Sequence, residues 1–209
     1  MALRDHSLDE KITAAAHAEF LEKGYAGASL RKIAENAGVT VGAIQTRYRS
    51  KDELFQSLLQ PFLDDIAATF QSVRADYYSG ASGDLPSQLK ASMQHESAAI
   101  LHLIFAHYEE AVLLLYRSAG SALEPYYDGL VKSKITESAA FFRAAGYTGV
   151  DETLLTLLIS AQFDSYRRIV AECPDRQTAE TYMRSLMTYH YGGWVALFDE
   201  TEQTQEAQK

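Results

Sequence analysis

Residues 29–51 read SLRKIAENAGVTVGAIQTRYRSK, a stretch that contains the start and stop signals of two short helices. Ser29 precedes the first helical segment, where its hydroxyl can accept a hydrogen bond from a free amide of the first turn. Gly38 can take the left-handed conformation that ends this helix, and Thr40 can cap the next one, expected over residues 41–48. Only residues 38–40 separate the pair, so the helices must cross rather than lie antiparallel. The stretch therefore predicts a helix-turn-helix.

The second helix of this unit has the surface chemistry needed to read DNA. Ile44 and Tyr48 are expected to face the core, which leaves the other side chains outward or on the flanks. Gln and Arg can form paired hydrogen bonds with base edges in the major groove, small apolar side chains can contact a thymine methyl group, and Gly42 permits close approach of the backbone. Hydroxyl and cationic groups near the helix starts suit phosphate oxygens. The DNA-binding candidates are Ser29, Arg31, Lys32, Thr40, Val41, Gly42, Ala43, Gln45, Thr46, Arg47, Tyr48 and Lys51.

The distribution of charge along the chain favours this interpretation. The 209 residues carry 19 basic and 28 acidic side chains, a formal charge of -9, which by itself disfavours a nucleic-acid binder. However, residues 1–51 hold 8 basic and 6 acidic side chains (+2), which leaves 11 basic and 22 acidic (-11) for the rest. Residues 29–51 hold five basic side chains against Glu35 alone. We call residues 1–51 the head and the rest of the chain the body. A basic head followed by an acidic body indicates an anionic partner for the head only.

The same residues have an alternative, purely structural interpretation. Two short capped helices joined by a tight turn are common in all-helical proteins that touch no DNA, and basic residues on a helix usually form a solvated face. From the residues of this segment alone, both interpretations stay open.

The segment from Ile12 to Phe55 resembles the TetR family of one-component transcriptional regulators. The residues that carry the resemblance, in the family's order and spacing, are Phe20, Gly24, Tyr25, Ser29, Leu30, Ile33, Ala34, Ala37-Gly38-Val39-Thr40, Gly42, Ile44, Tyr48, Ser50-Lys51 and Glu53-Leu54-Phe55. The resemblance covers about a fifth of the chain. It implies an all-α homodimer with an N-terminal DNA-binding head, a ligand-binding body and no catalysis, and it implies phosphate contacts at Ser29, Thr40 and Lys51.

Three positions depart from the family's pattern. Gln45 stands where an aromatic residue that touches the DNA backbone is usual, and Arg47 stands where His or Tyr is more frequent. Lys32 stands where an acid is frequent, so we expect Arg31 and Lys32 to add contacts to the DNA backbone. These departures bear on which operator sequence the head prefers.

Helical periodicity extends over nearly the whole chain, and no strict alternation is sustained. We expect an all-α fold of about nine helices: one from a capping box at residues 7–10 to Gly24, the two of the helix-turn-helix, and others over 51–78, 86–118 with a break near His107, 125–145, 152–173 and 176–198. The segment from Gly80 to Asp84 breaks the pattern. We divide the chain into a DNA-binding domain (1–50), a helical ligand-binding and dimerisation domain (51–200) and a polar, frayed tail (201–209).

The two helices expected over 152–173 and 176–198 are the candidates for a dimer interface. The first is apolar on more than one face, and the second contains Gly192 and Gly193, which each cost about 1 kcal/mol of helix propensity unless another helix approaches closely. We expect both helices to pair with their symmetry mates around a two-fold axis that matches a palindromic operator. The alternative is ordinary core packing within one chain. The interface candidates are Leu154, Leu158, Tyr182, Leu186, Tyr189, Gly193 and Trp194.

Tyrosine is over-represented in the body, because 11 of the 13 tyrosines follow residue 51. Aromatic residues with a polar handle can line a mostly apolar pocket and orient a ligand, although core packing is the ordinary role of each one. Glu109 and Asp164, if they point inward, favour a cationic aromatic ligand. We expect a small, mostly apolar or aromatic effector, with ligand-binding candidates His102, Phe105, Tyr108, Glu109, Tyr116, Phe163, Tyr166 and Arg167.

Several other classes of protein are disfavoured. The single cysteine, Cys173, excludes an internal disulfide framework, and the spacing of His95, His102 and His107 does not suit a metal site. No phosphate-binding loop or nucleophile motif is found, so we expect no cofactor, no metal and no enzyme. The sequence has no signal peptide and no apolar run long enough to cross a bilayer, so we expect a cytoplasmic protein that does not bind membranes.

The function that fits these observations is a ligand-responsive repressor that binds double-stranded DNA as a homodimer. The alternatives are a helical small-molecule-binding protein without operator binding, and a helical enzyme that converts its bound molecule.

Overall fold

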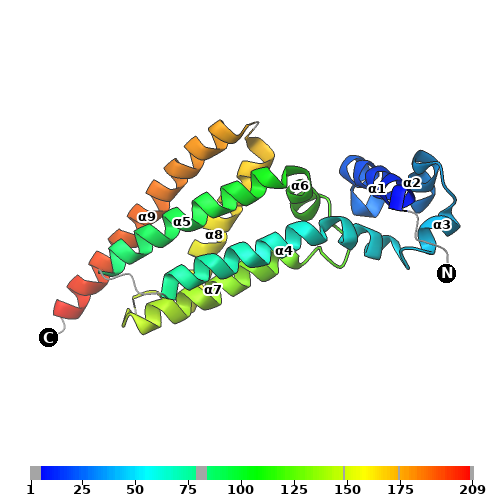
Figure 1. Ribbon diagram of the computed structural model, residues 1–209. Helices are drawn as coiled ribbons and strands as arrows, with labels where there is room; N and C mark the ends of the chain where they lie inside the picture. Colours follow the sequence, from blue (N-terminus) through cyan, green and yellow to red (C-terminus); the bar gives the residue numbers. More distant parts are fainter. Residues whose placement is uncertain (1–5, 79–83, 148, 174, 208–209) are drawn as a thin grey trace. The chain divides into compact units, whose positions relative to one another are not determined.

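The computed structural model describes residues 6–78, 84–147, 149–173 and 175–207, and within them the chain forms nine helices and no strand (Figure 1). The helices are α1 (His6–Gly27), α2 (Leu30–Ala37), α3 (Val41–Gln45), α4 (Lys51–Tyr78), α5 (Leu85–Ala106), α6 (Tyr108–Tyr116), α7 (Tyr126–Ala144), α8 (Glu152–Glu172) and α9 (Arg176–Ala207). The predicted all-α class and number of helices are therefore confirmed. No single helix among these residues is long and apolar enough to span a membrane; α5 and α6 reach that length and composition only as a pair, and the chain bends between them.

The predicted helix-turn-helix forms through the expected local hydrogen bonds. The Ser29 hydroxyl accepts from the Arg31 amide at 3.2 Å and caps α2, and the Thr40 hydroxyl accepts from the Ala43 amide at 3.1 Å and caps α3. Gly38 ends α2 with a φ of 68° and a ψ of 32°, which is the left-handed conformation that its position requires. The turn between the two helices is thus specified by caps on both sides.

The structure corrects several predicted helix bounds. The assigned helix α1 continues to Gly27, but Gly24 inside it has a φ of 69° and a ψ of 166°, so the regular helix does stop where the sequence indicated. Helix α3 ends at Gln45 and not near Tyr48, and α9 continues to Ala207 through most of the segment that we expected to be frayed. Residues 80–83 of the predicted break at 80–84, and the last two residues of the predicted tail, lie outside the described residues.

The chain divides into two compact units that differ from the predicted domains. The first comprises the chain up to Asp65 together with His107–Tyr127, and the second comprises Ile66–Ala106 and the chain from Asp128 onward. Helix α4 contributes to both units, and α6 belongs to the unit that contains the helix-turn-helix. The division of function at residue 50 stays a prediction.

The core of the first unit is built around three aromatic rings. The ring of Phe20 lies 4.9 Å from that of Phe55 and 6.1 Å from that of Tyr25, centroid to centroid. Helix α6 joins this core, because the Tyr25 amide donates to the Arg117 carbonyl at the end of α6 at 2.7 Å. His17 on α1 also lies 3.6 Å from the carboxylates of both Glu109 and Glu110 on α6. The helix-turn-helix is therefore packed in one unit with α6.

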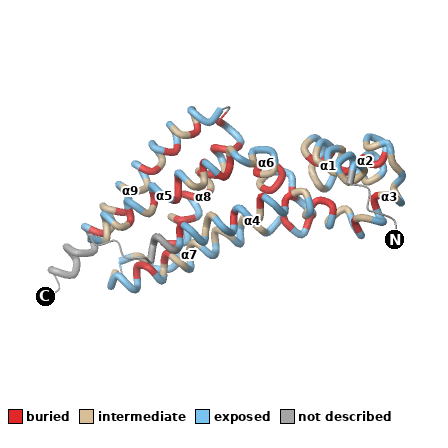
Figure 2. The backbone as a smooth tube through the Cα atoms, viewed as in Figure 1, coloured by how far each residue is buried: buried red, intermediate tan, exposed pale blue. Residues whose placement is uncertain are grey.

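The second unit has its own aromatic core, which contains Trp194. The Trp194 ring lies 5.3 Å from Phe142 and 6.4 Å from Phe198, and the residue is 5% exposed (Figure 2 shows buried positions in red). Trp194 was predicted to lie at a dimer interface; the structure places it in the core of its own chain, because it lies on the side of α9 that packs against α7. The other interface candidates are more exposed.

A buried ion pair also lies in the second unit. Glu96 on α5 is 3% exposed and pairs with the ammonium of Lys134 on α7, while the second carboxylate oxygen of Glu96 is buried without a hydrogen-bond partner. A buried pair of charges contributes little net stability, but the loss of one partner leaves an uncompensated charge.

We therefore predict that Lys134→Met lowers the free energy of unfolding by about 3–5 kcal/mol, and that Glu96→Met/Lys134→Met restores most of it. The measurement is urea unfolding followed by circular dichroism. The matched control is Arg74→Met, which removes the partly exposed Arg74–Glu137 pair and is expected to cost no more than about 1 kcal/mol. An unfolding free energy of the double variant as low as that of Lys134→Met contradicts the prediction.

Candidate nucleic-acid interface and the groove of the body

The solvent-facing side of α3 carries most of the predicted base-reading residues. Gln45 and Thr46 are exposed, and so are Thr40 and Gly42 at the start of the helix. Val41 and Ala43 are half-buried on the flanks, and Ile44 is fully buried beneath them. A Cβ added to Gly42 would meet nothing closer than 3.8 Å, so within this chain its surface is open. Tyr48 is 8% exposed and lies in the core, which was its expected place; its inclusion among the DNA-binding residues gains no support from this position.

Arg47 lies half-buried on the flank, one of the two places expected for it, and is held by its own unit. Its side chain is 16% exposed, its Nε donates to the Asp9 carboxylate on α1 at 2.5 Å, and its Nη1 donates to the Ala43 carbonyl at 3.3 Å. A guanidinium held by two acceptors fixes the end of α3 against α1. The structure therefore gives Arg47 a role in positioning α3.

Lys51 is also held within its own unit. Its ammonium donates to the carbonyls of Tyr25 at 2.7 Å and Ala28 at 3.0 Å, and lies 4.3 Å from the centroid of the Tyr25 ring. These contacts join the start of α4 to the end of α1. Burial, together with the Asp52 carboxylate, raises the pKa of the Tyr25 hydroxyl, so that this ring stays neutral beside the ammonium.

The basic side chains of α2, and Arg49 in the α3–α4 connection, are exposed. Lys32 pairs with Glu35 on the same helix at 3.2 Å, and both side chains are at least half exposed. The pair is therefore weak, and Lys32 can leave Glu35 for another anion. Arg31 is exposed, and so is Arg49, which was not among the predicted site residues. The signal for Arg49 was present in the sequence, because it is one of the five basic residues of the helix-turn-helix segment.

The predicted ligand-binding residues do not gather at one place within either unit. Tyr108, Glu109 and Tyr116 belong to the first unit and are exposed there. The other five belong to the second unit, where the side chains range from exposed His102 to buried Phe163 and Tyr166. The predicted ligand pocket therefore stays a prediction.

Glu109 and Asp164, the two acids that suggested a cationic ligand, lie next to basic side chains of this chain. Glu109 lies near His17 on α1. Asp164 accepts hydrogen bonds from Arg167 at 2.7 Å and Arg168 at 3.0 Å, and these bonds lower the pKa of its carboxyl group. A carboxylate paired in this way gives no support to the cationic ligand.

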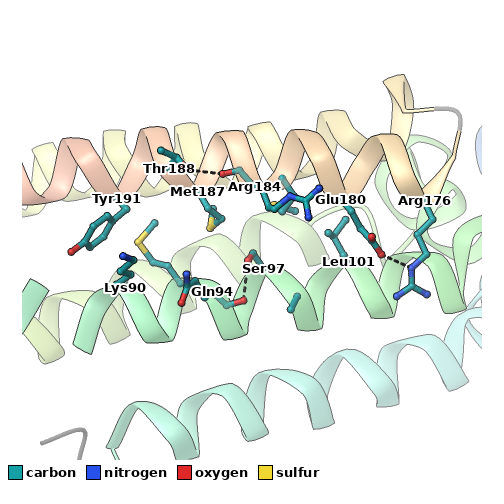
Figure 3. Close-up of a pocket in the computed structure, with 13 residues that line it drawn as sticks. Lys90, Gln94, Ser97, Leu101, Arg176, Glu180, Arg184, Met187, Thr188 and Tyr191 are labelled. Carbon is teal, nitrogen blue, oxygen red and sulfur yellow. Dashed lines mark hydrogen bonds and ion pairs between the residues drawn. The ribbon is translucent and has the colours of Figure 1, made fainter. Parts of the chain in front are cut away.

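A groove lies between α5 and α9 in the second unit (Figure 3). Its volume is about 650 Å³, within the range of small-molecule sites. The apolar wall includes Met93 and Leu101 of α5 and Met187 of α9; Lys90, Arg176 and Arg184 line the same groove. The hydroxyl of Tyr166, a predicted ligand residue, donates to the Met187 sulfur at 3.6 Å from the core side. None of the predicted ligand-binding residues lines the groove itself, and the sequence signal that could have found it is the spacing of the methionines.

The face of α9 that bears the interface candidates is open to solvent. Tyr182 is 55% and Tyr189 76% exposed, and Leu157 on α8, beside two of the candidates, is 63% exposed. Leu154, Leu158 and Leu186 are half-buried, and Gly193 is exposed with nothing within 4 Å of an added Cβ. Within the described chain, no other element approaches Gly192 or Gly193 closely enough to account for glycine at these two positions of α9.

Comparison with known proteins places the DNA-binding segment. Residues 12–58 match the family model described as bacterial regulatory proteins, tetR family. The HTH-type transcriptional repressor KstR2 of Rhodococcus jostii (strain RHA1) is 26% identical over 93 residues, which are 44% of this chain and 44% of that repressor. The match thus spans less than half the length of the curated relative.

Solved structures extend the likeness of fold over nearly the whole chain. A TetR-like transcriptional regulator from Rhodococcus sp. RHA1 superposes with a TM-score of 0.61 at 16% identity, covering 92% of this chain and 100% of that one. The ketosteroid transcriptional regulator KstR2 of Mycobacterium tuberculosis gives 0.62 at 20% identity over 92% and 96% of the chains. FadR from Bacillus subtilis, in complex with stearoyl-CoA, gives 0.59 at 15% identity over 88% and 98%. Residues 12–58 therefore match the tetR family of bacterial regulatory proteins, and the chain as a whole shares the fold of TetR-like transcriptional regulators.

Proposed function

We propose that the chain is a ligand-responsive repressor that binds a palindromic operator in double-stranded DNA as a homodimer. The observation that carries this proposal is the exposed face of α3, where Gln45 and Thr46 stand on a capped helix within the one strongly basic segment of an acidic chain. A helix of this kind fits the major groove, and a Gln side chain can form paired hydrogen bonds with adenine.

The phosphate contacts come from the groups that surround α3. Ser29 and Thr40 lie at helix starts, where backbone amides and the positive end of the helix dipole favour an anion. Arg31, Lys32 and Arg49 add positive charge at exposed positions. Lys51 uses two of its three N–H donors on carbonyls, which leaves capacity for one phosphate oxygen. Arg47 contacts DNA only if its bond to Asp9 opens, so we assign it first to holding α3 in place.

The homodimer forms through α8 and the outward face of α9. Tyr182, Leu186, Tyr189 and Gly193 fall within about 60° of one another on a helix of 3.6 residues per turn. Such a face of large aromatic and aliphatic groups, followed by an open glycine, suits the close approach of a symmetry mate. A two-fold dimer presents two copies of α3 to half-sites about 34–36 Å apart.

The effector is a small, mostly apolar molecule that binds in the body and lowers operator affinity. Support comes from the groove of the second unit and from FadR of Bacillus subtilis, a protein of similar fold whose structure contains stearoyl-CoA. A ligand can release DNA only through its different affinity for two forms of the protein, and about 1.4 kcal/mol of such coupling changes operator affinity tenfold. We assign the transmission to α4, which is one helix shared by both units.

The remaining parts of the proposal concern what the protein does not do. We propose no catalysis, no cofactor and no metal, and a location in the cytoplasm, where the chromosome of a bacterial cell lies. Binding of the gene's own upstream intergenic DNA, in preference to random duplex DNA, separates a repressor from a helical ligand-binding protein that does not recognise an operator.

We predict that Gln45→Ala weakens operator binding about 5- to 160-fold per half-site and relaxes the preference for operator over random DNA, because one base contact is worth about 1–3 kcal/mol. The measurement is a gel-shift titration with both duplexes. Gln71→Ala, which changes an exposed glutamine of α4, is the matched control and leaves both affinities unchanged. Equal loss on both duplexes contradicts a base-reading role for Gln45.

We predict that Arg31→Ala/Lys32→Ala reduces the salt dependence of operator binding. Each lost phosphate contact lowers the magnitude of the slope of log K against log salt by about 0.9, so four contacts in a dimer lower it by about 3.6. The measurement is operator affinity over a series of salt concentrations. The control, Lys132→Ala/Arg143→Ala, removes the same charge from exposed positions of α7. A slope that stays at the wild-type value refutes the phosphate contacts of Arg31 and Lys32.

We predict that Leu157→Glu/Tyr189→Glu converts the homodimer to a monomer, because burying four like charges across a two-fold axis is strongly unfavourable. Light scattering at micromolar concentration measures the mass, and circular dichroism verifies that the helices persist. The control is Gln177→Glu, an exposed position on another face of α9. A wild-type chain that is already monomeric, or a variant that stays dimeric, argues against this interface.

A further inference from the structure

The groove between α5 and α9 collects the methionines of the chain. The chain has four methionines, and the three that follow Met1 line this groove: Met93, Met183 and Met187. Methionine is flexible and polarisable, so a surface rich in it adapts to apolar groups of varying shape. Ala98 and Leu101 complete the apolar wall. The groove is therefore suited to a flexible apolar chain rather than to one rigid ring system.

The groove is also electropositive, in contrast to the body that contains it. It is lined by Lys90, Arg176 and Arg184 against the single acid Glu180, whereas acidic side chains outnumber basic ones 22 to 11 after Lys51. Arg176 donates to Glu180 at 2.8 Å. Lys90 lies 5.6 Å from the centroid of the Tyr191 ring, and the contact of Arg184 is with the Thr181 hydroxyl at 3.5 Å. After the Arg176–Glu180 pair is subtracted, the lining of the groove keeps two positive charges.

The cations and the apolar wall are arranged along the groove in a way that suits one ligand with two parts. Lys90 lies with Tyr191 at one end, Arg184 lies nearer the middle, and Leu101 lies towards the end that holds Arg176 (Figure 3). The turns of α5 from Lys90 to Leu101 cover about 16 Å at 1.5 Å per residue. This length accommodates a medium-length alkyl chain whose polar end reaches Lys90 or Arg184.

We propose that this groove binds an anionic amphiphile: a carboxylate or phosphate group held by Lys90 and Arg184, with an alkyl chain over the methionines. The assignment rests on the proposed function, because it names the class of effector and its site in the body. Charge complementarity selects the anion, since a cationic head group would meet the net positive charge of the groove. The groove and the exposed tyrosines lie on different faces of α9, so a ligand that shifts α9 against α5 also shifts the face assigned to the dimer.

The test uses the full-length protein without DNA and four ligands that share a dodecyl chain. Isothermal titration below the micelle concentration compares dodecanoate, dodecyl phosphate, dodecanol and dodecyltrimethylammonium. We expect both anions to bind at least about tenfold more tightly than the alcohol and the cation, which corresponds to one or more charge-assisted hydrogen bonds. The two anions also distinguish a carboxylate from a phosphate ligand. Equal binding of the cation, or no binding of either anion, overturns the proposal.

Variants locate the site. Lys90→Gln/Arg184→Gln is expected to weaken dodecanoate binding about tenfold or more and to leave the affinity for dodecanol unchanged, since only the head-group contacts are removed. Lys132→Gln/Arg143→Gln, the same change of charge at exposed positions of α7, leaves both affinities unchanged. A variant that binds dodecanoate as wild type does, or that changes the oligomeric state in light scattering, overturns the assignment; in the second case the groove is an interface between copies.

Operator release is measured separately. If the anions bind in the expected pattern and also release the operator, both the ligand class and its role as effector are supported. If they bind in this pattern but the chain shows no preference for its upstream DNA, the groove assignment stands and the proposed repressor function fails.

Discussion

The left-handed turn at Gly38 is the constraint on which the DNA-binding surface depends. A capped helix ends on one side of it and another capped helix begins three residues later, so the crossing of α2 and α3 is fixed by local hydrogen bonds. A side chain at Gly38 meets no steric obstacle, but its φ of 68° is costly for any residue with a Cβ. The backbone, rather than packing around the glycine, therefore decides which side of α3 faces outward.

The long cationic side chains next to this turn stabilise the head before they can contact DNA. Arg47 joins α3 to α1 through Asp9, and Lys51 joins α4 to the carbonyls at the end of α1. Arg47 thereby holds α3, and Lys51 the start of α4, against α1 within the first unit. In the proposed repressor, base reading then falls to shorter side chains such as Gln45 and Thr46, which are exposed at the end of the short helix α3. This arrangement lowers the entropy that is lost when a recognition helix binds.

Helix α9 divides its surface among three environments. Trp194 and Phe198 pack into the aromatic core, Met187 and Arg184 face the groove, and Tyr182 and Tyr189 are open to solvent. Because a helix moves as a rigid body, a shift of α9 in one of these three environments also changes its contacts in the other two. In the proposed repressor, this property would let the occupancy of the groove influence how two chains meet.

The sequence by itself determined the helices, their caps and the family resemblance. Ser29, Gly38 and Thr40 act within four residues of their own positions, so their effects can be read from the linear order. Only the tertiary structure decided the partners of Arg47 and Lys51, which lie 38 and 26 residues away along the chain, and the burial of Trp194. The groove was hidden for the same reason: Met93 and Met187 belong to one wall only after α5 and α9 pack together. Local hydrogen bonds are encoded within one helical turn, whereas the choice between solvent, core and a distant partner depends on which helices the fold brings into contact.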